Sequence, residues 1–347
     1  MTVAPLLATR NLRKHFSLRG GLLHRVQAVV QAVDGVSFEV HAGETLGIVG
    51  ESGCGKSTTA RLLMRLVTPD AGDVVFDGAP VGRPGGLGLR DLRRQMQMVF
   101  QDSYASLNPR LPAAMSIAYG PLVHGVPRSS ALKRAAGLLE AVGLRPELFA
   151  NRYPHELSGG QRQRINIARA LALEPRLLIL DEAVSALDRS IGAQVLNVLI
   201  DLKRRFNLTY VFISHDLDVV QFVSDRVMVM YLGKVVEIGP VEEVYSHPRH
   251  PYTRALLSAM PSMDPDHRIQ QAPLGGDPPN PINPPSGCRF RTRCAFAEDV
   301  CARREPPLGG VPGPLTVRGG LTPPSCSPGH DAACHMLVPG SGHTRAA

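Results

Sequence analysis

The stretch Gly50-Glu51-Ser52-Gly53-Cys54-Gly55-Lys56-Ser57 carries the strongest fold signal in this chain of 347 residues. It follows the apolar run Leu46-Gly47-Ile48-Val49 and precedes a helical pattern, so it joins a predicted strand to a predicted helix. In such a loop the backbone N–H groups and the helix N-terminus point at phosphate oxygens, and glycines let the backbone approach closely. The sequence therefore predicts a nucleotide site formed by Gly50, Glu51, Ser52, Gly53, Cys54, Gly55, Lys56, Ser57 and Thr58.

The residues at the end of this loop have distinct expected tasks. We expect the ammonium group of Lys56 to reach the β- and γ-phosphates and the hydroxyl of Ser57 to ligate Mg²⁺. Thr58 is expected to support the α-phosphate. Cys54 lies inside the loop, where its small size is sufficient reason for its presence.

A second apolar run, Leu177-Leu178-Ile179-Leu180, ends in the two carboxylates Asp181 and Glu182. Adjacent side chains at a strand end point in different directions, so these two acids can have different tasks. Asp181 is placed to bind Mg²⁺ through water, and Glu182 is left free to polarise the attacking water. Together with the phosphate loop they predict an enzyme that hydrolyses a nucleoside triphosphate.

Strand-like and helical segments alternate around these motifs up to residue 260. Strands are expected at 44–49, 97–100, 176–180, 209–213 and 226–230, and helices at 56–67, 160–173 and 191–206. Such alternation predicts an α/β fold with a largely parallel sheet covered by helices. Between Gln101 and Leu157 the apolar pattern is helical only, which indicates a helical subdomain inserted at about residues 102–170.

The run Leu157-Ser158-Gly159-Gly160-Gln161 precedes an apolar helical pattern. A Ser-Gly-Gly turn at a helix N-terminus makes a second anion cradle. The run matches the signature of the ATP-binding-cassette (ABC) superfamily, and this resemblance implies an ABC-type P-loop NTPase with a RecA-like core. It also implies a head-to-tail dimer, in which the signature of one subunit closes over the ATP held by the other through Ser158, Gly159, Gly160 and Gln161.

Four further positions resemble functional residues of the ABC superfamily. Phe16 resembles the aromatic residue that stacks on adenine, and Gln101 resembles the glutamine that touches Mg²⁺ and relays contact with the membrane subunit. Asp188 ends a run that resembles the loop contacting the opposite subunit. His215 resembles the histidine that contacts the γ-phosphate. The resemblance thus implies Glu182 and His215 as the catalytic residues.

Over nearly its whole length the chain resembles the second ATPase subunit of oligopeptide and dipeptide permeases. The resemblance includes MYLGKVVEIG at 230–239 and His250-Pro251-Tyr252-Thr253, the box that opens the C-terminal extension of that subfamily. It implies peptide uptake with two integral-membrane permease subunits, a paralogous ATPase subunit and an extracytoplasmic solute-binding protein. Uptake of nickel or another small solute is one alternative. A soluble ABC ATPase acting on nucleic acid or on iron–sulfur assembly is the other.

The composition of the chain changes near residue 260. Residues 261–347 hold 16 of the 30 prolines and 11 of the 34 glycines. At that content regular packed structure needs further support, so something else must order this part of the chain. We therefore expect an ABC nucleotide-binding domain at residues 1–245 and a C-terminal extension of permease type at residues 246–347.

Five of the six cysteines lie in the extension, namely Cys288, Cys294, Cys301, Cys326 and Cys334. Their spacing does not fit the Cys-x2-Cys pairs of zinc knuckles. The permease resemblance implies instead a 4Fe-4S cluster on Cys288, Cys294, Cys301 and a distant fourth cysteine, which would tie the extension together. We expect the fourth ligand to be Cys334 rather than Cys326. Bound zinc and free thiols are the alternatives.

The chain is basic, with a formal net charge of +8, but only five of its 38 basic residues are lysines. The excess is spread along the sequence, so we expect no nucleic-acid partner. The longest apolar runs fall far short of the roughly 18 residues that cross a bilayer, and the N-terminus lacks a signal-peptide pattern. With the permease resemblance, this places the expected protein peripherally on the cytoplasmic face of the membrane.

Overall fold

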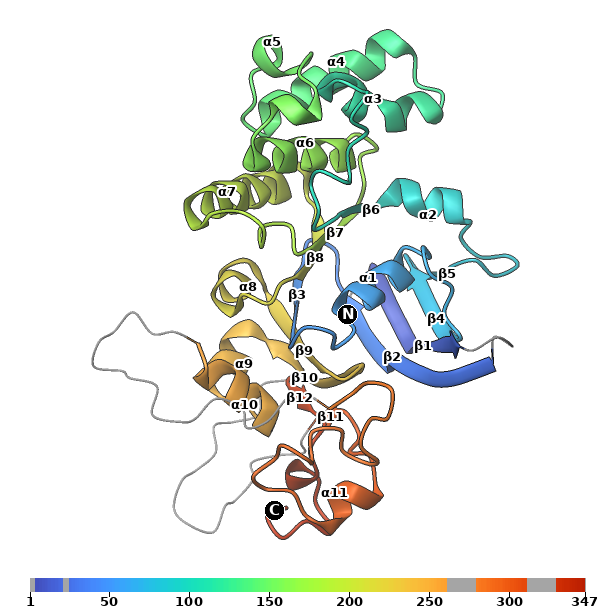
Figure 1. Cartoon of the computed structure of the whole chain (residues 1–347), viewed down its shortest axis with the longest axis vertical. Coiled ribbons are helices and arrows are strands. Elements are labelled where there is room, and N and C mark those ends of the chain that lie inside the picture. Colours follow the sequence, from blue (N-terminus) through green and yellow to red (C-terminus); the bar gives the residue numbers. More distant parts are fainter. Residues whose placement is uncertain (1–3, 21–24, 261–278, 311–328, 347) are drawn as a thin grey trace, which may run out of the picture.

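An eight-stranded sheet in the order β11-β12-β10-β9-β3-β8-β7-β6 forms the centre of the molecule (Figure 1). The structure is a computed structural model that describes residues 4–20, 25–260, 279–310 and 329–346. The parallel part of the sheet consists of β3 (Thr45–Val49), β6 (Met96–Val99), β7 (Leu177–Asp181), β8 (Thr209–Ile213) and β9 (Arg226–Tyr231). The prediction of an α/β fold with a largely parallel sheet is confirmed.

Alternate residues of the parallel strands enter two different hydrophobic cores. Leu178 and Leu180 of β7 pack in the core that contains helices α6 and α7. Leu177 and Ile179 pack on the opposite face, with helix α1. This division follows from the period of two along a strand, and it explains why strands buried on both faces are continuously apolar. The helices next to these strands are α1 (Lys56–Leu63), α2 (Leu89–Gln95), α7 (Arg189–Phe206) and α8 (Leu217–Val223).

A second, antiparallel sheet in the order β2-β1-β4-β5 covers α1, and the sequence analysis did not anticipate it. Its strands are β1 (Leu7–Gly20), β2 (Arg25–Val40), β4 (Ala71–Phe76) and β5 (Ala79–Pro80). The register of β1 against β2 shifts at four places, beginning between Thr9 and Leu12. Each shift interrupts the simple alternation of apolar and polar residues by which a half-buried strand is recognised.

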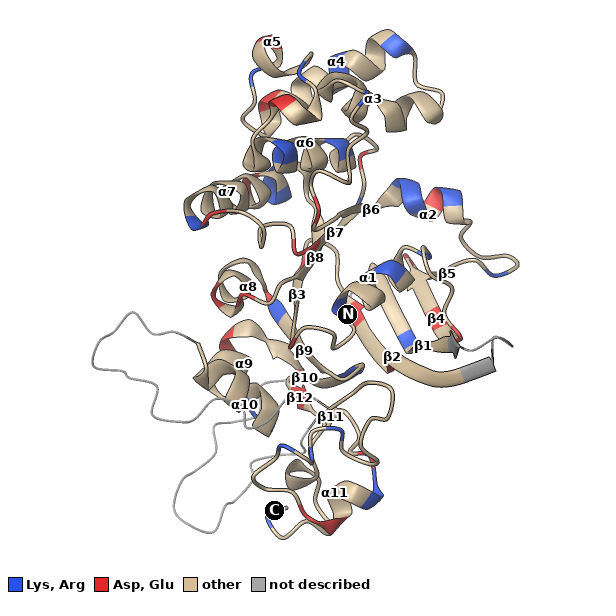
Figure 2. Ribbon diagram, in the orientation of Figure 1, with Lys and Arg blue, Asp and Glu red and all other residues tan. Residues whose placement is uncertain are grey.

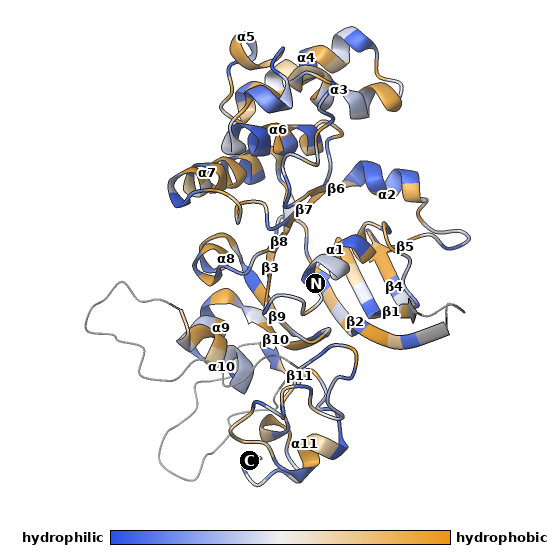
Figure 3. Cartoon of the chain, in the orientation of Figure 1, coloured by the Kyte–Doolittle hydropathy of each residue, from blue (hydrophilic) through white to orange (hydrophobic). Residues whose placement is uncertain are grey.

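All regular elements between residues 101 and 171 are helical. They are α3 (Ala113–Val123), α4 (Arg128–Ala141), α5 (Pro146–Phe149), the 3-10 helix η1 (Pro154–Glu156) and α6 (Gly159–Leu171). Helix α6 buries Ile165 and Ile167 against the sheet and the neighbouring helices, and Figure 3 shows hydrophobic and hydrophilic colours on the same helix. Basic residues lie on many elements, among them α1, α2, α4, α6 and α7, and on the C-terminal segment, which is defined here as the described residues of 246–346 (Figure 2).

The C-terminal segment adds two short strands to the central sheet. Strand β10 (Lys234–Pro240) pairs with β9 and, on its other side, with β12 (Asp331–Ala332), which pairs with β11 (Gly309–Gly310). The remaining elements are α9 (Val241–Ser246), α10 (Pro251–Ser258), α11 (Asp299–Arg303) and the 3-10 helix η2 (His335–Leu337). Across the described ranges, none of the helices combines the length and apolarity needed to cross a membrane.

Candidate active site

The phosphate loop, residues 50–55, leaves β3 and enters α1 (Figure 1). Gly50, Gly53 and Gly55 have φ angles of 148°, 78° and 108°, which lie in the region that favours glycine. A Cβ atom at Gly50 would lie 2.2 Å from the carbonyl oxygen of Met230, and one at Gly55 would lie 2.2 Å from that of Ala32. No other residue type fits these two positions without a backbone shift, so the loop can wrap tightly around the N-terminus of α1.

Lys56 and Ser57 start α1 with their polar groups turned to this loop and to β7. The buried ammonium group of Lys56 donates hydrogen bonds to the carbonyl oxygens of Gly50 and Glu51, at 2.8 and 3.0 Å. The hydroxyl of Ser57 donates to the Oδ1 atom of Asp181 at 2.9 Å. A hydroxyl and a buried carboxylate that meet at one point are the oxygen ligands that Mg²⁺ prefers, so these two residues fit the predicted magnesium site.

Burial raises the pKa of the Asp181 carboxyl, whose side chain lies at the end of β7. The hydrogen bond from Ser57 lowers this pKa, and the neighbouring charge of Glu182 raises it. A divalent cation beside Asp181 would oppose the effect of burial on this pKa, because it stabilises the ionised carboxylate. Ser57 and Asp181 are therefore the residues here that could hold such a cation.

Glu182 brings two further predicted residues together. Its Oε2 atom accepts a hydrogen bond of 2.8 Å from the Gln101 amide and one of 3.2 Å from the Ser185 hydroxyl, while its Oε1 atom lies 3.5 Å from Nδ1 of His215. The Glu182 side chain is 17% exposed and that of His215 is 59% exposed, so water can reach both. With φ at 49°, Glu182 adopts a left-handed backbone conformation at the strand end, where the chain turns sharply.

The signature run starts helix α6 as an N-terminal cap. The Ser158 hydroxyl accepts from the backbone N–H of Gln161 at 3.3 Å, and the Gln161 side chain accepts from the backbone N–H of Ser158 at 3.0 Å. Gly160 packs against Ile191, whose methyl group would lie 2.4 Å from a Cβ atom there. Ser158 is exposed, and in the described ranges no hydrogen bond joins it to the phosphate loop of the same chain.

The remaining predicted nucleotide residues occupy separate positions. Phe16 on β1 is 39% exposed, with the Lys14 ammonium 5.5 Å from its ring centre. Asp188 is exposed at the N-cap of α7, and Thr58 lies in the first turn of α1. Cys54 is buried in the hydrophobic core beside α1, and this burial raises the pKa of its thiol.

The predicted cluster cysteines lie near one another in the C-terminal segment. Burial raises the pKa of the Cys334 thiol to about 12, and charge on Cys288, Cys294 or Cys301 would raise it further. Cys301 and Cys334 are buried and Cys288 and Cys294 are half-buried. Four thiols suit iron or zinc, but within the described ranges no three His, Cys, Asp or Glu side chains are arranged to hold a metal ion. Cys326 lies outside the described residues. Cysteine thiols are ligands of the kind that bind an iron–sulfur cluster, but in the described structure these side chains are not arranged around a common metal position.

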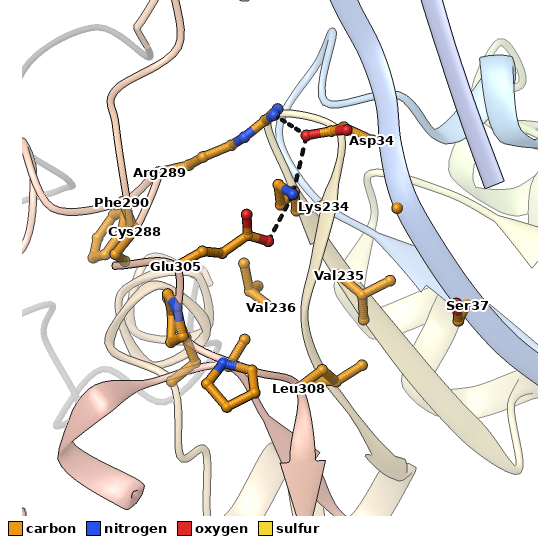
Figure 4. Close-up of a pocket in the computed structure, with 16 residues that line it drawn as sticks. Asp34, Ser37, Lys234, Val235, Val236, Cys288, Arg289, Phe290, Glu305 and Leu308 are labelled. Atoms are coloured by element: carbon orange, nitrogen blue, oxygen red, sulfur yellow. Dashed lines mark hydrogen bonds and ion pairs between the residues drawn. The ribbon is translucent and has the colours of Figure 1, made fainter. Parts of the chain in front are cut away.

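Sequence reasoning did not find the contacts between the C-terminal segment and the nucleotide-binding elements. Buried Arg289 donates to Asp34 on β2, and Lys234 on β10 pairs with both Asp34 and Glu305 (Figure 4). These four side chains border a cavity of about 380 Å³ between the two parts of the chain. Tyr252, in the run His250-Pro251-Tyr252-Thr253 (the HPYT box), accepts a hydrogen bond of 2.9 Å from the backbone N–H of Glu51. Only the HPYT box gave any sequence signal for these contacts.

Comparison with known proteins agrees with this geometry. Residues 33–185 match the ABC transporter family, and residues 236–301 match the C-terminal region of oligopeptide/dipeptide transporters. A putative peptide import ATP-binding protein of Brucella ovis is 49% identical over 335 residues, which cover 96% of this chain and 98% of the relative. The chain belongs to the ABC transporter family. As an ABC protein, it has the ATP-binding fold that the phosphate loop and the signature run predicted.

Other relatives of this ABC protein extend the comparison. The oligopeptide transport ATP-binding protein AppF of Bacillus subtilis is 47% identical over 95% of this chain and 97% of its own length. The glutathione import ATP-binding protein GsiA of Pectobacterium atrosepticum is 54% identical over 80% of this chain and 45% of its own length.

Two solved ABC structures share the fold. The cbiO1 protein of Clostridium perfringens, part of the ABC transporter complex cbiONQ, has a TM-score of 0.60 at 27% identity and covers 70% of this chain and 91% of its own. A dimeric ATP-binding cassette, MJ0796 in a post-hydrolysis state with ADP and Pi, has a TM-score of 0.57 at 28% identity, over 68% and 98% of the two chains. Both matches leave part of this chain uncovered.

Proposed function

We propose that this chain is the ATP-hydrolysing subunit of an importer that takes up di- or oligopeptides. The observation that carries the proposal is the hydrogen bond between Ser57 and Asp181 beside Glu182, at the carboxyl ends of β3 and β7, in a chain with a transporter-type C-terminal region. Relatives named for peptide import, oligopeptide transport and glutathione import support the substrate class, since glutathione is itself a small peptide.

The phosphate loop and the start of α1 bind the nucleotide in this proposal. Backbone N–H groups of residues 50–58 hold the phosphates, and the Lys56 ammonium exchanges its two loop carbonyl acceptors for phosphate oxygens. Ser57, Asp181 and Gln101 would hold Mg²⁺, which neutralises charge on the phosphates when it is bound. The exposed ring of Phe16 stacks on adenine.

Glu182 and His215 serve the hydrolytic step. The Glu182 carboxylate polarises the attacking water. To do so, it must either release the hydrogen bond that it accepts from Gln101 or accept hydrogen bonds from Gln101 and the water together. His215, 3.5 Å from the same carboxylate and largely exposed, contacts the γ-phosphate from the other side. The proximity of Gln101, Glu182 and His215 supports these roles, because each group can reach the same phosphoryl oxygen region.

The signature run acts on the nucleotide of a second ATPase subunit. Ser158, Gly159, Gly160 and Gln161 open a helix that points an exposed N-terminus outward, which suits an anion supplied by another chain. Asp188, exposed at the start of α7, contacts that subunit. A dimeric ABC neighbour with bound ADP and Pi supports such an assembly. We propose a paralogue as the second subunit.

The complete importer contains two integral-membrane permease subunits and an extracytoplasmic solute-binding protein, with this chain on the cytoplasmic face of the membrane. ATP contacts the phosphate loop of one subunit and the signature run of the other, which closes the ATPase dimer, and hydrolysis reopens it. The names of the peptide-import relatives support these partners.

We propose that the nucleotide-binding domain comprises residues 1–245 and contains the helical subdomain at about 102–170. The extension follows at residues 246–347.

A 4Fe-4S cluster on Cys288, Cys294, Cys301 and Cys334 remains part of the proposal. The mutual proximity of these thiols supports it, although within the described ranges their side chains are not arranged to hold a metal ion. Zinc and free thiols are the alternatives, and Cys326 is the alternative fourth ligand. No step of ATP hydrolysis depends on the cluster.

Purification with bound partners tests the function. The chain should copurify with integral-membrane subunits, and in vesicles containing the assembled importer its ATP hydrolysis should rise when the solute-binding protein carries a tri- or tetrapeptide. Lys56→Ala, which removes the phosphate-binding ammonium, should abolish uptake and hydrolysis together. Copurification with DNA alone, or stimulation by nickel and not by peptide, would overturn the peptide-importer proposal.

A further inference from the structure

The C-terminal segment contributes an arginine to the phosphate loop itself. The Nη1 atom of Arg293 lies 3.0 and 2.9 Å from the two carboxylate oxygens of Glu51, and the two side chains are only 6% and 22% exposed. Arg293 directly precedes Cys294, and Glu51 is the second residue of the phosphate loop. A shielded, charge-assisted contact therefore joins two segments that are 242 residues apart in the sequence.

Packed aromatic rings hold this contact in place. Tyr231, Tyr252 and Phe290 lie in mutual contact, with ring centres 4.6 to 5.5 Å apart. The Tyr252 hydroxyl accepts from the backbone N–H of Glu51, and Nη1 of Arg293 also lies 3.5 Å from the Tyr231 hydroxyl. Glu51 is thus held both by its backbone and by its side chain, so the C-terminal segment restrains the shape of the loop.

The C-terminal segment has a separate anchor on the rest of the chain. Arg289 pairs with Asp34, and Glu305 pairs with Lys234 at 2.6 Å, at the edge of the cavity (Figure 4). The printed partners of these pairs differ from those of the Arg293–Glu51 pair. A change at Arg293 should therefore alter the charge next to the loop while the segment stays docked.

We propose that Arg293 is a positioning residue for nucleotide binding, which neutralises Glu51 and holds its carboxylate away from the phosphates. The proposal rests on the proposed function, because it assumes that the phosphate loop binds ATP. A carboxylate released beside the polyphosphate would repel it, and the repulsion is strong where the surroundings are partly buried. The C-terminal segment is then a part of the nucleotide site and not merely an attachment to it.

The test is a double-mutant cycle that neutralises Arg293 and Glu51 in the full-length chain with its partner subunits. Affinity is measured with a fluorescent ATP analogue in the presence of Mg²⁺. Arg293→Gln should weaken binding about three- to tenfold and raise KM for ATP with little change in kcat. Glu51→Gln combined with Arg293→Gln should restore the affinity, because the carboxylate that causes the repulsion is gone. Arg291→Gln is the matched control, since among the described residues the Arg291 side chain bonds to Ser286 within the same segment.

The outcomes separate the proposal from simpler explanations. Equal affinity in wild type and Arg293→Gln overturns it, as does equal loss in the single and double variants, which would indicate a structural role alone. Arg293→Lys provides a second check if the glutamine variant unfolds: retained charge should keep most of the affinity. If the wild-type chain bound no ATP analogue, the proposed function itself would fail, and the charge cycle would have no signal to compare.

Discussion

The side-chain amide of Gln101 donates a hydrogen bond of 2.8 Å to the carboxylate of Glu182. The bond connects the end of β6, which leads into the helical subdomain, with the end of β7. Under the proposed function, drawing Glu182 toward water would loosen or redirect Gln101. We propose this bond as a route by which the state of the nucleotide would reach helices α3 to α6.

Replacing Glu182 by Gln should keep ATP binding and stop turnover. The amide matches the carboxylate in shape but cannot polarise water, so steady-state hydrolysis should fall by about 100-fold or more. Glu174→Gln is a matched control, because Glu174 is 73% exposed and pairs with Arg134 far from the phosphate loop. Hydrolysis near the wild-type rate in the Glu182 variant would contradict the assignment.

Replacing Ser158 by Arg should block hydrolysis at the nucleotide of the other subunit. A long cation at this exposed helix start obstructs closure of the dimer, whereas the phosphate loop of the same chain is untouched. Single-site ATP binding should stay within about twofold of wild type while turnover of the assembled importer is lost. Ser129→Arg, at an exposed position in the first turn of α4, should leave turnover unchanged.

Cys301→Ser should remove iron and acid-labile sulfide from protein purified without oxygen, because it deletes one of four cluster ligands. Separate Cys326→Ser and Cys334→Ser variants identify the fourth ligand, and only the second should lose iron. Elemental analysis that finds zinc alone, or no metal, would refute the cluster and leave the ATPase assignment intact.

Buried His250 should make the folded protein less stable as pH falls from 7 to 5. Burial lowers the pKa of His250 to about 4, although the nearby charge of Glu237 opposes this shift. In that pH range the unfolded chain takes up a proton at this position and the folded chain does not, so the free energy of unfolding falls with falling pH. The expected loss is about 2 kcal/mol.

His250→Asn tests this contribution. Asparagine can still accept the Tyr252 backbone N–H that caps α10, but it does not titrate. Urea unfolding at pH 7 and pH 5 should show a smaller difference for this variant than for wild type, and the exposed-site variant His155→Asn should behave as wild type. An undiminished difference in His250→Asn would contradict the prediction.

The alternating pattern of strands and helices was sufficient to predict the parallel core. The resemblance to ABC proteins pointed to Gln101 and His215, which the structure places beside Glu182. The antiparallel sheet escaped prediction because bulges break the alternation of β1 and β2. The contact of Arg293 with Glu51 also escaped prediction, because an ion pair between segments 242 residues apart leaves no periodic pattern in either one. The expected helix at 56–67 ends earlier, at Leu63, where Met64 caps it.

The pairing of β12 with β10 has a consequence for any shortened form of the chain. Residues 235–239 of β10 are buried. The C-terminal segment covers this strand, because the backbone N–H of Ala333 donates to the carbonyl oxygen of Val236 and Ala332 pairs with Glu237. Cutting the chain after residue 245 would turn β10 into an exposed, apolar edge strand with unpaired backbone groups. Exposed edge strands pair with strands of other molecules, so a truncated nucleotide-binding domain should self-associate and precipitate even with its phosphate loop intact.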